Sequence, residues 1–235
     1  MNYTYRAGNY SNAPEFIHFI GYVNCPELLE KAIASTIPVA REGMGVIIDN
    51  RSDRSLPAPH MLMEGKEAEQ YFSVLEPDVP LTFAQTMNFL IKISAAANSK
   101  FFTWIHADGE VIGNSLELVL HARQQIADGT KWGTIFTLYD IYAAFSTEAC
   151  LATGDWDWLR FPFYFCDNDY YHRLRTADYK IINIGGQGII HHNEASNTIK
   201  NDPLRLMLNH HLFPVWEKLF KDKYAEDTVL SWEGE

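Results

Sequence analysis

The feature that constrains this chain most is a regular alternation of strand-like and helical segments. Near-continuous apolar runs occupy residues 16–23, 45–50 and 101–106, which are short enough for strands. Between them, residues 25–37 and 81–99 repeat apolar side chains at helical spacing. Strands without a polar face are typical of a sheet that helices cover on both sides. The alternation therefore predicts an α/β fold with a largely parallel central sheet.

The rest of the chain continues this alternation. Further strand-like segments are residues 69–76, 133–146 and 180–192, and further helical segments are residues 113–129, 166–179 and 201–235. Asn114 or Ser115 is a suitable N-cap for the first of these helices. Pro214 predicts an interruption of the C-terminal helical region. With 235 residues, we expect a single domain over 1–235 with its core at about 16–200.

Charge and cysteine content narrow the class of protein. The net charge is −11, so we do not expect nucleic acid or an anionic membrane as a partner, because binding to either depends on Lys and Arg. Cys25, Cys150 and Cys166 are widely separated and odd in number, which indicates reduced thiols and a cytoplasmic location. No apolar run approaches the ~20 residues of a membrane span, so we expect no such span. The polar first residues do not resemble a signal peptide.

Polar residues stand at the carboxyl ends of three of the expected strands. These groups are Asp49-Asn50, His106 to Glu110, and His191-His192. In open α/β sheets, ligands bind just beyond the carboxyl ends of the strands. The sequence therefore predicts a binding site that these three groups share.

Asp108 is the first candidate for a metal ligand in this site. It follows a buried strand and stands between the small residues Ala107 and Gly109, so a ligand can approach it closely. Carboxylate oxygens suit Mg²⁺ or Mn²⁺, which also bind substrate phosphates. The alternative interpretation is a loop aspartate that caps the next helix.

Asp167 is a candidate general base. It follows a run of aromatic residues and begins a helix, which places a carboxylate at the edge of an apolar pocket. The alternative for Asp167 and Asp169 is helix capping, which the helix dipole favours. Trp156 and Trp158, just before this run, are suited either to a sugar-binding platform or to the core.

The remaining motifs are weaker. Asp49 and Asn50 are suited to bind a base or ribose, or to form a turn. His191 or His192 is able to face a metal, but no HExxH or CxxC occurs, which disfavours a zinc hydrolase. The sequence also lacks GxxxxGK[ST] and GxGxxG, so it does not support assignment to the P-loop proteins or to the proteins with a dinucleotide-binding fingerprint.

Taken in order, several segments resemble the GT-A nucleotide-sugar glycosyltransferases, most closely family 2-like enzymes. The resemblance covers roughly residues 16–200, and small viral enzymes with an "HND"-type motif are the nearest likeness. It rests on "VIIDNRSD", "IHADGEV", "CDNDYYHRL" and "GIIHHNEASNT". "IHADGEV" is similar to the DxD region of these enzymes, with His106 at its first position and Asp108 at its last.

The resemblance implies a GT-A fold with a mixed, mostly parallel sheet. It also implies an inverting transfer of a sugar from a nucleotide-sugar, with UDP favoured, to a hydroxyl acceptor, for which a glycan is expected. Asp108, with His191 or His192, would hold Mn²⁺ or Mg²⁺; Glu110 would be a water-mediated ligand or exposed; and Asp167 would be the catalytic base. The implied donor-side residues are Gly21, Tyr22, Asp49, Asn50, Ser52, Asn88, His106 and Ala107. The implied acceptor-side residues are Trp156, Asp157 and Trp158.

Two positions depart from the pattern. His106 replaces the usual first acid of the metal motif, and Cys166 stands where an acid commonly precedes the base. Three alternatives remain: a nucleotidyltransferase that makes nucleotide-sugars, a glycosyltransferase that acts on modified nucleic-acid bases, and an inactive sugar-binding protein. The first should carry a Gly- and Lys/Arg-rich loop after the first strand, which "GYVNCPELLEK" lacks.

Overall fold

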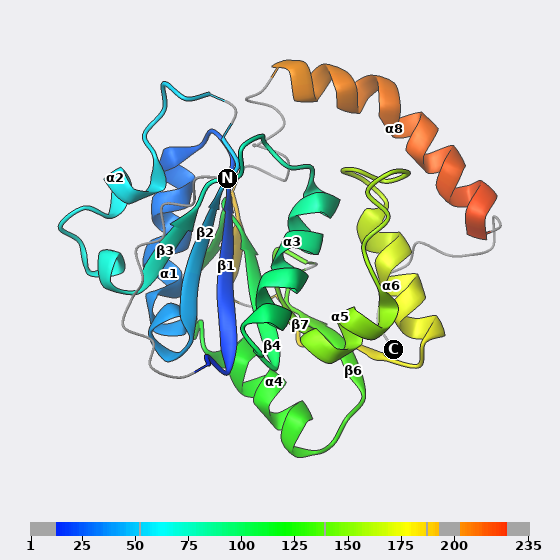
Figure 1. Cartoon of the computed structure of the whole chain (residues 1–235), viewed down its shortest axis with the longest axis horizontal. Helices are drawn as coiled ribbons and strands as arrows, with labels where there is room; N and C mark the ends of the chain where they lie inside the picture. The colour runs from blue at the N-terminus through cyan, green and yellow to red at the C-terminus, as the bar shows by residue number, and fades with distance from the viewer. Residues whose placement is uncertain (1–12, 52, 139, 187, 193–202, 225–235) are drawn as a thin grey trace.

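A seven-stranded sheet forms the centre of the protein (Figure 1). The computed structural model describes residues 13–51, 53–138, 140–186, 188–192 and 203–224. The strands of this sheet are β1 (Phe16–Tyr22), β2 (Met44–Asp49), β3 (Phe72–Leu75), β4 (Phe101–His106), β6 (Trp132–Phe136), β7 (Tyr142–Ser146) and β8 (Lys180–Asn183). Their order is β3-β2-β1-β4-β7-β6-β8.

The sheet is mixed but mostly parallel. Strands β3, β2, β1 and β4 run parallel to one another, β7 is antiparallel to β4 and β6, and β8 is parallel to β6. In Figure 1, β1 runs from bottom to top, so the carboxyl ends of the parallel strands lie at the top. The predicted α/β fold is confirmed.

Helices cover both faces of the sheet. One face packs on α1 (Pro26–Glu42) and α4 (Glu117–Ala127). The other packs on α3 (Phe83–Ala96), α5 (Thr147–Thr153) and α6 (Cys166–Thr176), and α8 (Pro203–Tyr224) joins this layer through Trp216 and Phe220. Two short elements, α2 (Pro59–Met63) and the 3-10 helix η1 (Glu67–Gln70), precede β3. Among the described residues, no helix combines the length and apolar character needed to cross a membrane.

The two-sided burial explains why β1 reads as one apolar run. Ile17 and Phe19 face the α3 side of the sheet, while Phe16 and Ile20 face the α1 side. Side chains of a strand alternate between its faces, so a strand buried on both faces needs apolar residues at nearly every position.

A second, two-stranded sheet lies beyond the end of β4. It pairs β5 (Gly109–Val111) with β9 (Ile189–His191) in antiparallel register, with Gly109 opposite His191. This pairing brings a segment from residues 189–192 to the polar end of β4, which sequence separation alone did not reveal.

Four expectations about elements were wrong. Residues 180–192 form two strands in different sheets, β8 and β9, because the chain leaves the central sheet after Asn183. Residues 133–146 form two antiparallel strands, because the chain reverses at Thr137–Ile141 inside the apolar run. Helix α8 continues through Pro214, and the packing of Trp216 and Phe220 holds the turns that follow it. The N-cap of α4 is Leu116; the Asn114 side chain accepts a hydrogen bond from Leu116 N at 3.1 Å, in a turn before the helix.

Candidate active site

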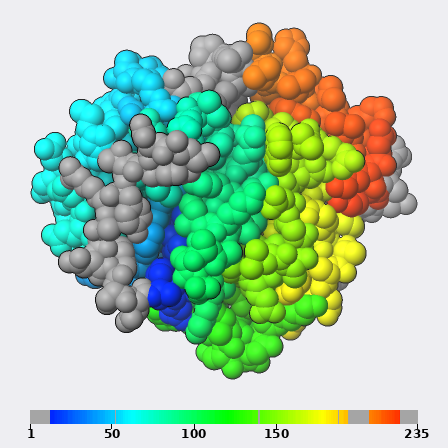
Figure 2. All heavy atoms as spheres, viewed as in Figure 1, coloured from blue at the N-terminus to red at the C-terminus, as the bar shows by residue number. Residues whose placement is uncertain are grey.

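A cavity of about 390 Å³ opens at the carboxyl edge of the sheet. The ends of β1, β2 and β4 form one wall, and α3, the start of α6 and α8 form the others. Figure 2 shows α8, in orange to red, lying beside the yellow-green segment that leads into α6. The polar groups of the expected site are brought to this cavity in part only.

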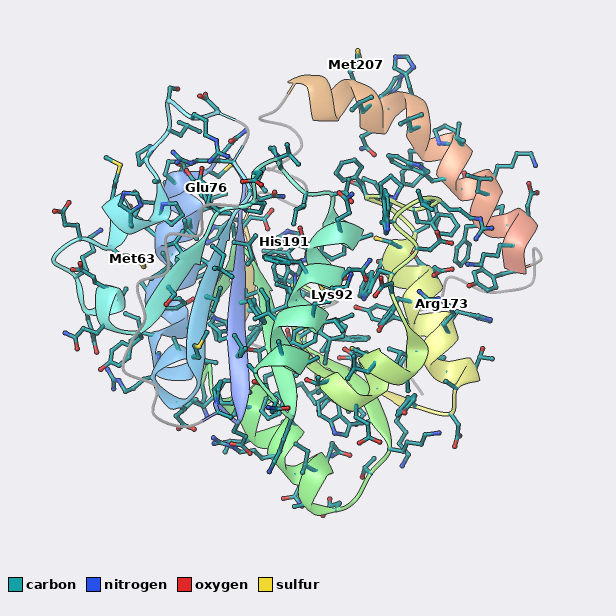
Figure 3. The ribbon with its side chains drawn as sticks, viewed as in Figure 1. Met63, Glu76, Lys92, Arg173, His191 and Met207 are labelled. Atoms are coloured by element: carbon teal, nitrogen blue, oxygen red, sulfur yellow. The ribbon has the colours of Figure 1, made fainter. Side chains whose placement is uncertain are left out.

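Asp108 and His191 meet on one wall of the cavity. The β5–β9 pairing places His191 Nε2 3.3 Å from Asp108 Oδ2, and the His192 N–H donates to the Asp108 carbonyl at 2.8 Å. Figure 3 labels His191 beside the upper part of the sheet, next to α3. Burial alone would raise the pKa of Asp108, but the His191 imidazole at 3.3 Å and the nearby His106 imidazole hold it below its usual value. The carboxyl is therefore ionised at neutral pH.

The Asp108 carboxylate has capacity for a further ligand. Asp108 is only 2% exposed, and within the described residues its Oδ1 atom has no hydrogen-bond partner. A buried carboxylate oxygen without a partner is costly unless a cation or donor occupies the site. The described part of the chain holds no cluster of three or more His, Cys, Asp or Glu residues suited to a metal. Asp108 and His191 therefore fit an ion that takes its remaining ligands from phosphate oxygens and water.

His192 lies in a different environment. Its Nε2 atom is 2.6 Å from Glu110 Oε2, and neither residue lines the cavity. Of the two adjacent histidines, the structure thus brings His191 and not His192 to Asp108. The expectation that His192 is a metal ligand, or Glu110 a water-mediated one, receives no support from these contacts.

His106 and Ala107 line the cavity beside Asp108. Burial lowers the pKa of His106 to about 4, and the charge of Asp108 offsets this only in part. The imidazole is therefore neutral at pH 7. It lies among aromatic rings, with centroids 5.7 Å from both Phe83 and Trp104. A neutral His106 imidazole adds a polar group to this wall and carries no positive charge that would repel a cation.

The expected nucleoside pocket is only partly assembled. Gly21 and Asn50 line the cavity. A Cβ at Gly21 would lie 2.3 Å from the Trp104 ring, so only glycine allows this packing. The Asn50 amide bonds the Leu81 backbone at both its N–H and carbonyl, at 2.5 and 2.7 Å, and so fixes the rim of the cavity. Ser52 lies outside the described residues.

Asp49 and Tyr22 are turned away from the cavity. Arg51 Nε lies 3.1 and 3.0 Å from the two Asp49 carboxylate oxygens, and the Tyr22 hydroxyl donates to the Pro57 carbonyl at 3.0 Å. Burial raises the pKa of Asp49, and the Arg51 charge opposes this shift. These contacts stabilise the loop after β2, which agrees with the interpretation of Asp49 as a turn residue. Neither side chain is positioned to contact a ligand in the cavity.

Asp167 lines the same cavity as Asp108. It belongs to the first turn of α6 and lines the cavity together with Asn168. Phe165, the residue before α6, has a left-handed φ of 63°, which is uncommon for an aromatic residue. Strained backbone of this kind concentrates at functional sites, and here it turns the chain so that α6 begins at the cavity.

Asp140 is a cavity residue that the sequence interpretation missed. It lies in the turn between β6 and β7 and is only 5% exposed. The signal available was an acid within the apolar run "TIFTLYDIYAAF". Since that run was taken as one β-like segment, the acid was not expected at a turn that faces a site.

Four further predicted residues do not reach the cavity. Asn88 binds the backbone of Trp156 at both ends, with distances of 3.0 and 2.7 Å. Trp156 is 1% exposed and stacks on Tyr170 with centroids 4.4 Å apart, so it belongs to the core. Asp157 pairs with Arg160 at 2.8 Å, and Trp158, which is 42% exposed, does not line the cavity either. The first three residues therefore shape the loop before α6.

A different set of aromatic residues lines the cavity beside α6 and α8. Phe163, Tyr164 and Phe165 precede α6, and Phe213 and Trp216 come from α8. The Tyr164 and Trp216 rings stack with centroids 6.2 Å apart. This wall was missed because α8 is separated from the motifs in sequence and shows no clear amphipathic pattern.

Comparison with known proteins identifies the fold. No protein-family model matches this sequence, and no curated protein matches it. Three solved structures illustrate the similarity. The mannosyltransferase PcManGT from Pyrobaculum calidifontis, in complex with GDP-Man and Mn²⁺, has a TM-score of 0.63 at 12% identity, covering 96% of this chain and 74% of that one.

GalNAc-T7 with UDP, GalNAc and Mn²⁺ has a TM-score of 0.57 at 12% identity, covering 92% of this chain and 53% of that one. Glucosyl-3-phosphoglycerate synthase from Mycobacterium tuberculosis, with Mn²⁺, UDP and glucosyl-3-phosphoglycerate, has a TM-score of 0.52 at 15% identity, covering 77% and 72%. These similarities show that the chain has the GT-A fold, the fold of nucleotide-sugar glycosyltransferases.

Proposed function

We propose that this protein is a metal-dependent, inverting glycosyltransferase. It would move a sugar from a nucleoside-diphosphate sugar, with UDP-sugars tested first, to a hydroxyl of an acceptor, and a glycan is the acceptor class we favour. The observation that carries the proposal is a single cavity lined by Asp108 and His191, which lie 3.3 Å apart, and by Asp167 at the start of α6. The GT-A fold supports it, since the compared enzymes were solved with nucleotides or a nucleotide-sugar and with Mn²⁺.

These residues divide the chemistry between them. Asp108 and His191 would hold Mn²⁺ or Mg²⁺, and the ion when bound supplies Lewis-acid stabilisation of the diphosphate leaving group. Asp167 accepts the proton of the acceptor hydroxyl while that oxygen forms a bond to the anomeric carbon. The bond from the anomeric carbon to the diphosphate oxygen breaks in the same step, and the diphosphate keeps the electron pair. Inversion follows because this displacement happens once.

A thermal-shift panel tests donor binding. UDP-, GDP- and TDP-sugars are added with MnCl₂, with MgCl₂, and with EDTA in place of metal. A donor at 100 times its Kd stabilises by about 2.7 kcal/mol, which raises the Tm of a chain of this size by about 5–10 °C. We expect a shift only when donor and metal are both present. If no donor shifts Tm in the presence of either metal, the proposed function is wrong.

Asp167→Asn then separates catalysis from binding. We expect transfer to fall at least about 100-fold, because a positioned general base contributes 10²–10⁴ to the rate. The Tm shift by donor and metal should persist, since Asp167 is not one of the proposed metal ligands. Loss of both properties would assign Asp167 a structural role.

A further inference from the structure

The buried carboxyl of Asp140 has no role in the site described so far. It lies in the Thr137–Ile141 turn and lines the cavity. Contacts on both sides of the turn fix its place: the His106 N–H donates to the Ile141 carbonyl at 3.0 Å, and a Cβ at Gly109 would lie 2.9 Å from Ile141 Cγ2. The turn is therefore packed against the end of β4.

Helix α6 packs on the other side of the same turn. Asp167 and Tyr171 are four residues apart, so they share one face of the helix. The Tyr171 ring lies 6.0 Å from Phe136, the last residue of β6 before the turn. Tyr171 and Asp167 both act electrostatically on Asp140, which lines the same cavity as Asp167. Asp140 thus faces the α6 surface that carries the proposed base.

These surroundings favour the neutral acid form of Asp140. Burial raises its pKa well above the usual range, and the charge of Asp167 raises it further, while Tyr171 opposes the shift. Burial likewise raises the pKa of the neighbouring Cys166 thiol, with added contributions from both aspartates. The other titratable residues that line the cavity are His106, Asp108, Tyr164 and His191.

Two carboxyl groups in one low-dielectric cavity share a proton more readily than they carry two charges. We propose that Asp140 is a positioning residue for Asp167, and that it keeps a proton in the reactive state and donates it as a hydrogen bond to the Asp167 carboxylate. One oxygen of Asp167 is then held, and the other is left to accept the proton of the acceptor hydroxyl. This inference rests on the proposed function for its catalytic consequence.

Two substitutions separate a proton donor from a mere space filler. Asp140→Asn keeps a neutral N–H donor, and Asp140→Leu keeps a similar volume without one. We expect the kcat of Asp140→Asn to stay within about fivefold of the wild-type value. The kcat of Asp140→Leu should fall about 10–100-fold, the effect of one hydrogen bond to a charged group. The KM for the nucleotide-sugar should stay unchanged in both. Equal losses in the two folded variants, or no loss in either, would overturn the proposal.

A titration that needs no turnover keeps this test independent of the proposed function. Carboxyl groups of ¹³C-aspartate-labelled protein are followed by NMR across pH. In the wild type we expect one carboxyl to titrate well above the usual aspartate range. That signal should be absent in Asp140→Asn and should move to lower pH in Asp167→Asn, while Asp155→Asn, which changes an exposed carboxylate, leaves it in place.

The two tests fail in distinguishable ways. If no nucleotide-sugar binds but the NMR signal responds to Asp167→Asn, the proposed function is wrong and the carboxyl pair stands. If Asp167→Asn leaves the high titration unchanged, the pair does not exist and this inference is wrong, whatever the donor panel shows. Thermal unfolding of each variant shows whether it folds. If Asp140→Leu fails to fold, the NMR titrations of Asp140→Asn and Asp167→Asn test the proposal.

Discussion

At the residue scale, adjacent side chains of the same type have different environments in this protein. His191 reaches Asp108 in the cavity, whereas His192 pairs with Glu110. Consecutive residues of an extended chain point to opposite sides, so only one of two neighbouring histidines is able to face a given ligand. The register of β9 against β5 determines which histidine faces Asp108, and this register is not evident from the sequence.

This difference predicts how the two histidines respond to substitution. With a UDP-sugar present, His191→Ala should weaken Mn²⁺ binding at least about tenfold, because it removes one of the two proposed protein ligands (1.4 kcal/mol corresponds to tenfold). His192→Ala is the matched control and should bind Mn²⁺ as the wild type does. Free Mn²⁺ measured by EPR in a titration gives the affinity. Equal weakening by both variants would contradict the assignment of His191.

His18 provides a prediction about pH. It is completely buried on β1, where its Nδ1 atom lies 2.8 Å from Thr103 Oγ1, and burial lowers its pKa to about 3. Between pH 6.5 and 3 the unfolded chain therefore binds a proton at this residue that the folded protein does not bind. Stability must fall as the pH drops through this window.

Urea unfolding at pH 7 and pH 5 measures the effect. The free energy of unfolding of the wild type should fall, relative to that of His18→Gln, by about 2 kcal/mol between the two pH values. His60→Gln, at an exposed position, is the control and should show the wild-type dependence. If the difference in free energy of unfolding between the wild type and His18→Gln did not change with pH, His18 would titrate in the folded protein as it does in the unfolded chain.

At the element scale, the start of α3 shows how local chemistry fixes the rim of the cavity. Thr82 accepts a hydrogen bond from Gln85 N at 3.3 Å, and the Gln85 side chain accepts one from Thr82 N at 2.9 Å. This reciprocal capping box starts the helix directly after Leu81, the residue held by Asn50. Helix α3 is thereby anchored where it meets the cavity.

The capping box predicts a modest loss on substitution. Thr82→Ala should reduce the free energy of unfolding by about 1 kcal/mol, because the N–H of Gln85 loses its acceptor. Thr176→Ala is the control: it removes an exposed hydroxyl at the end of α6 and should change stability by less than about 0.5 kcal/mol. Chemical denaturation of both variants compares them. Equal effects would show that the cap contributes nothing specific.

At the scale of the whole molecule, α8 completes the cavity although it is remote in sequence from the other walls. Trp216 is 4% exposed and packs on Phe163 and Tyr164, while Met207 is 50% exposed (Figure 3 shows Met207 on the outer side of α8). The helix therefore depends on a few aromatic contacts near its middle and second half.

Truncation of the main anchor tests this arrangement. Trp216→Ala should lower the free energy of unfolding by about 3–5 kcal/mol, because it leaves a large cavity among aromatic rings. Met207→Ala, on the same helix, should change it by less than about 0.5 kcal/mol. Urea unfolding followed by circular dichroism measures both. Similar small losses would show that α8 does not pack as described.

The sequence by itself determined the sheet, the helices around it and most of the edge where the cavity opens. It did so because strands buried on two faces read as apolar runs, and because ligand-binding polar groups follow such strands. Asp108 is predicted on these grounds and Asp167 from its place at the start of a helix after an aromatic run, and both line the cavity. Their proposed roles await the experiments above.

Only the tertiary structure decided which polar groups share that cavity. It placed His191 beside Asp108 through a strand pairing, turned Asp49 to Arg51, and put Trp156 in the core. It also brought Asp140 and α8 to the site. Local patterns depend on neighbours a few residues away, whereas the contacts of His191, Trp156 and α8 join segments separated by tens of residues, and their geometry exists only once the sheet has formed.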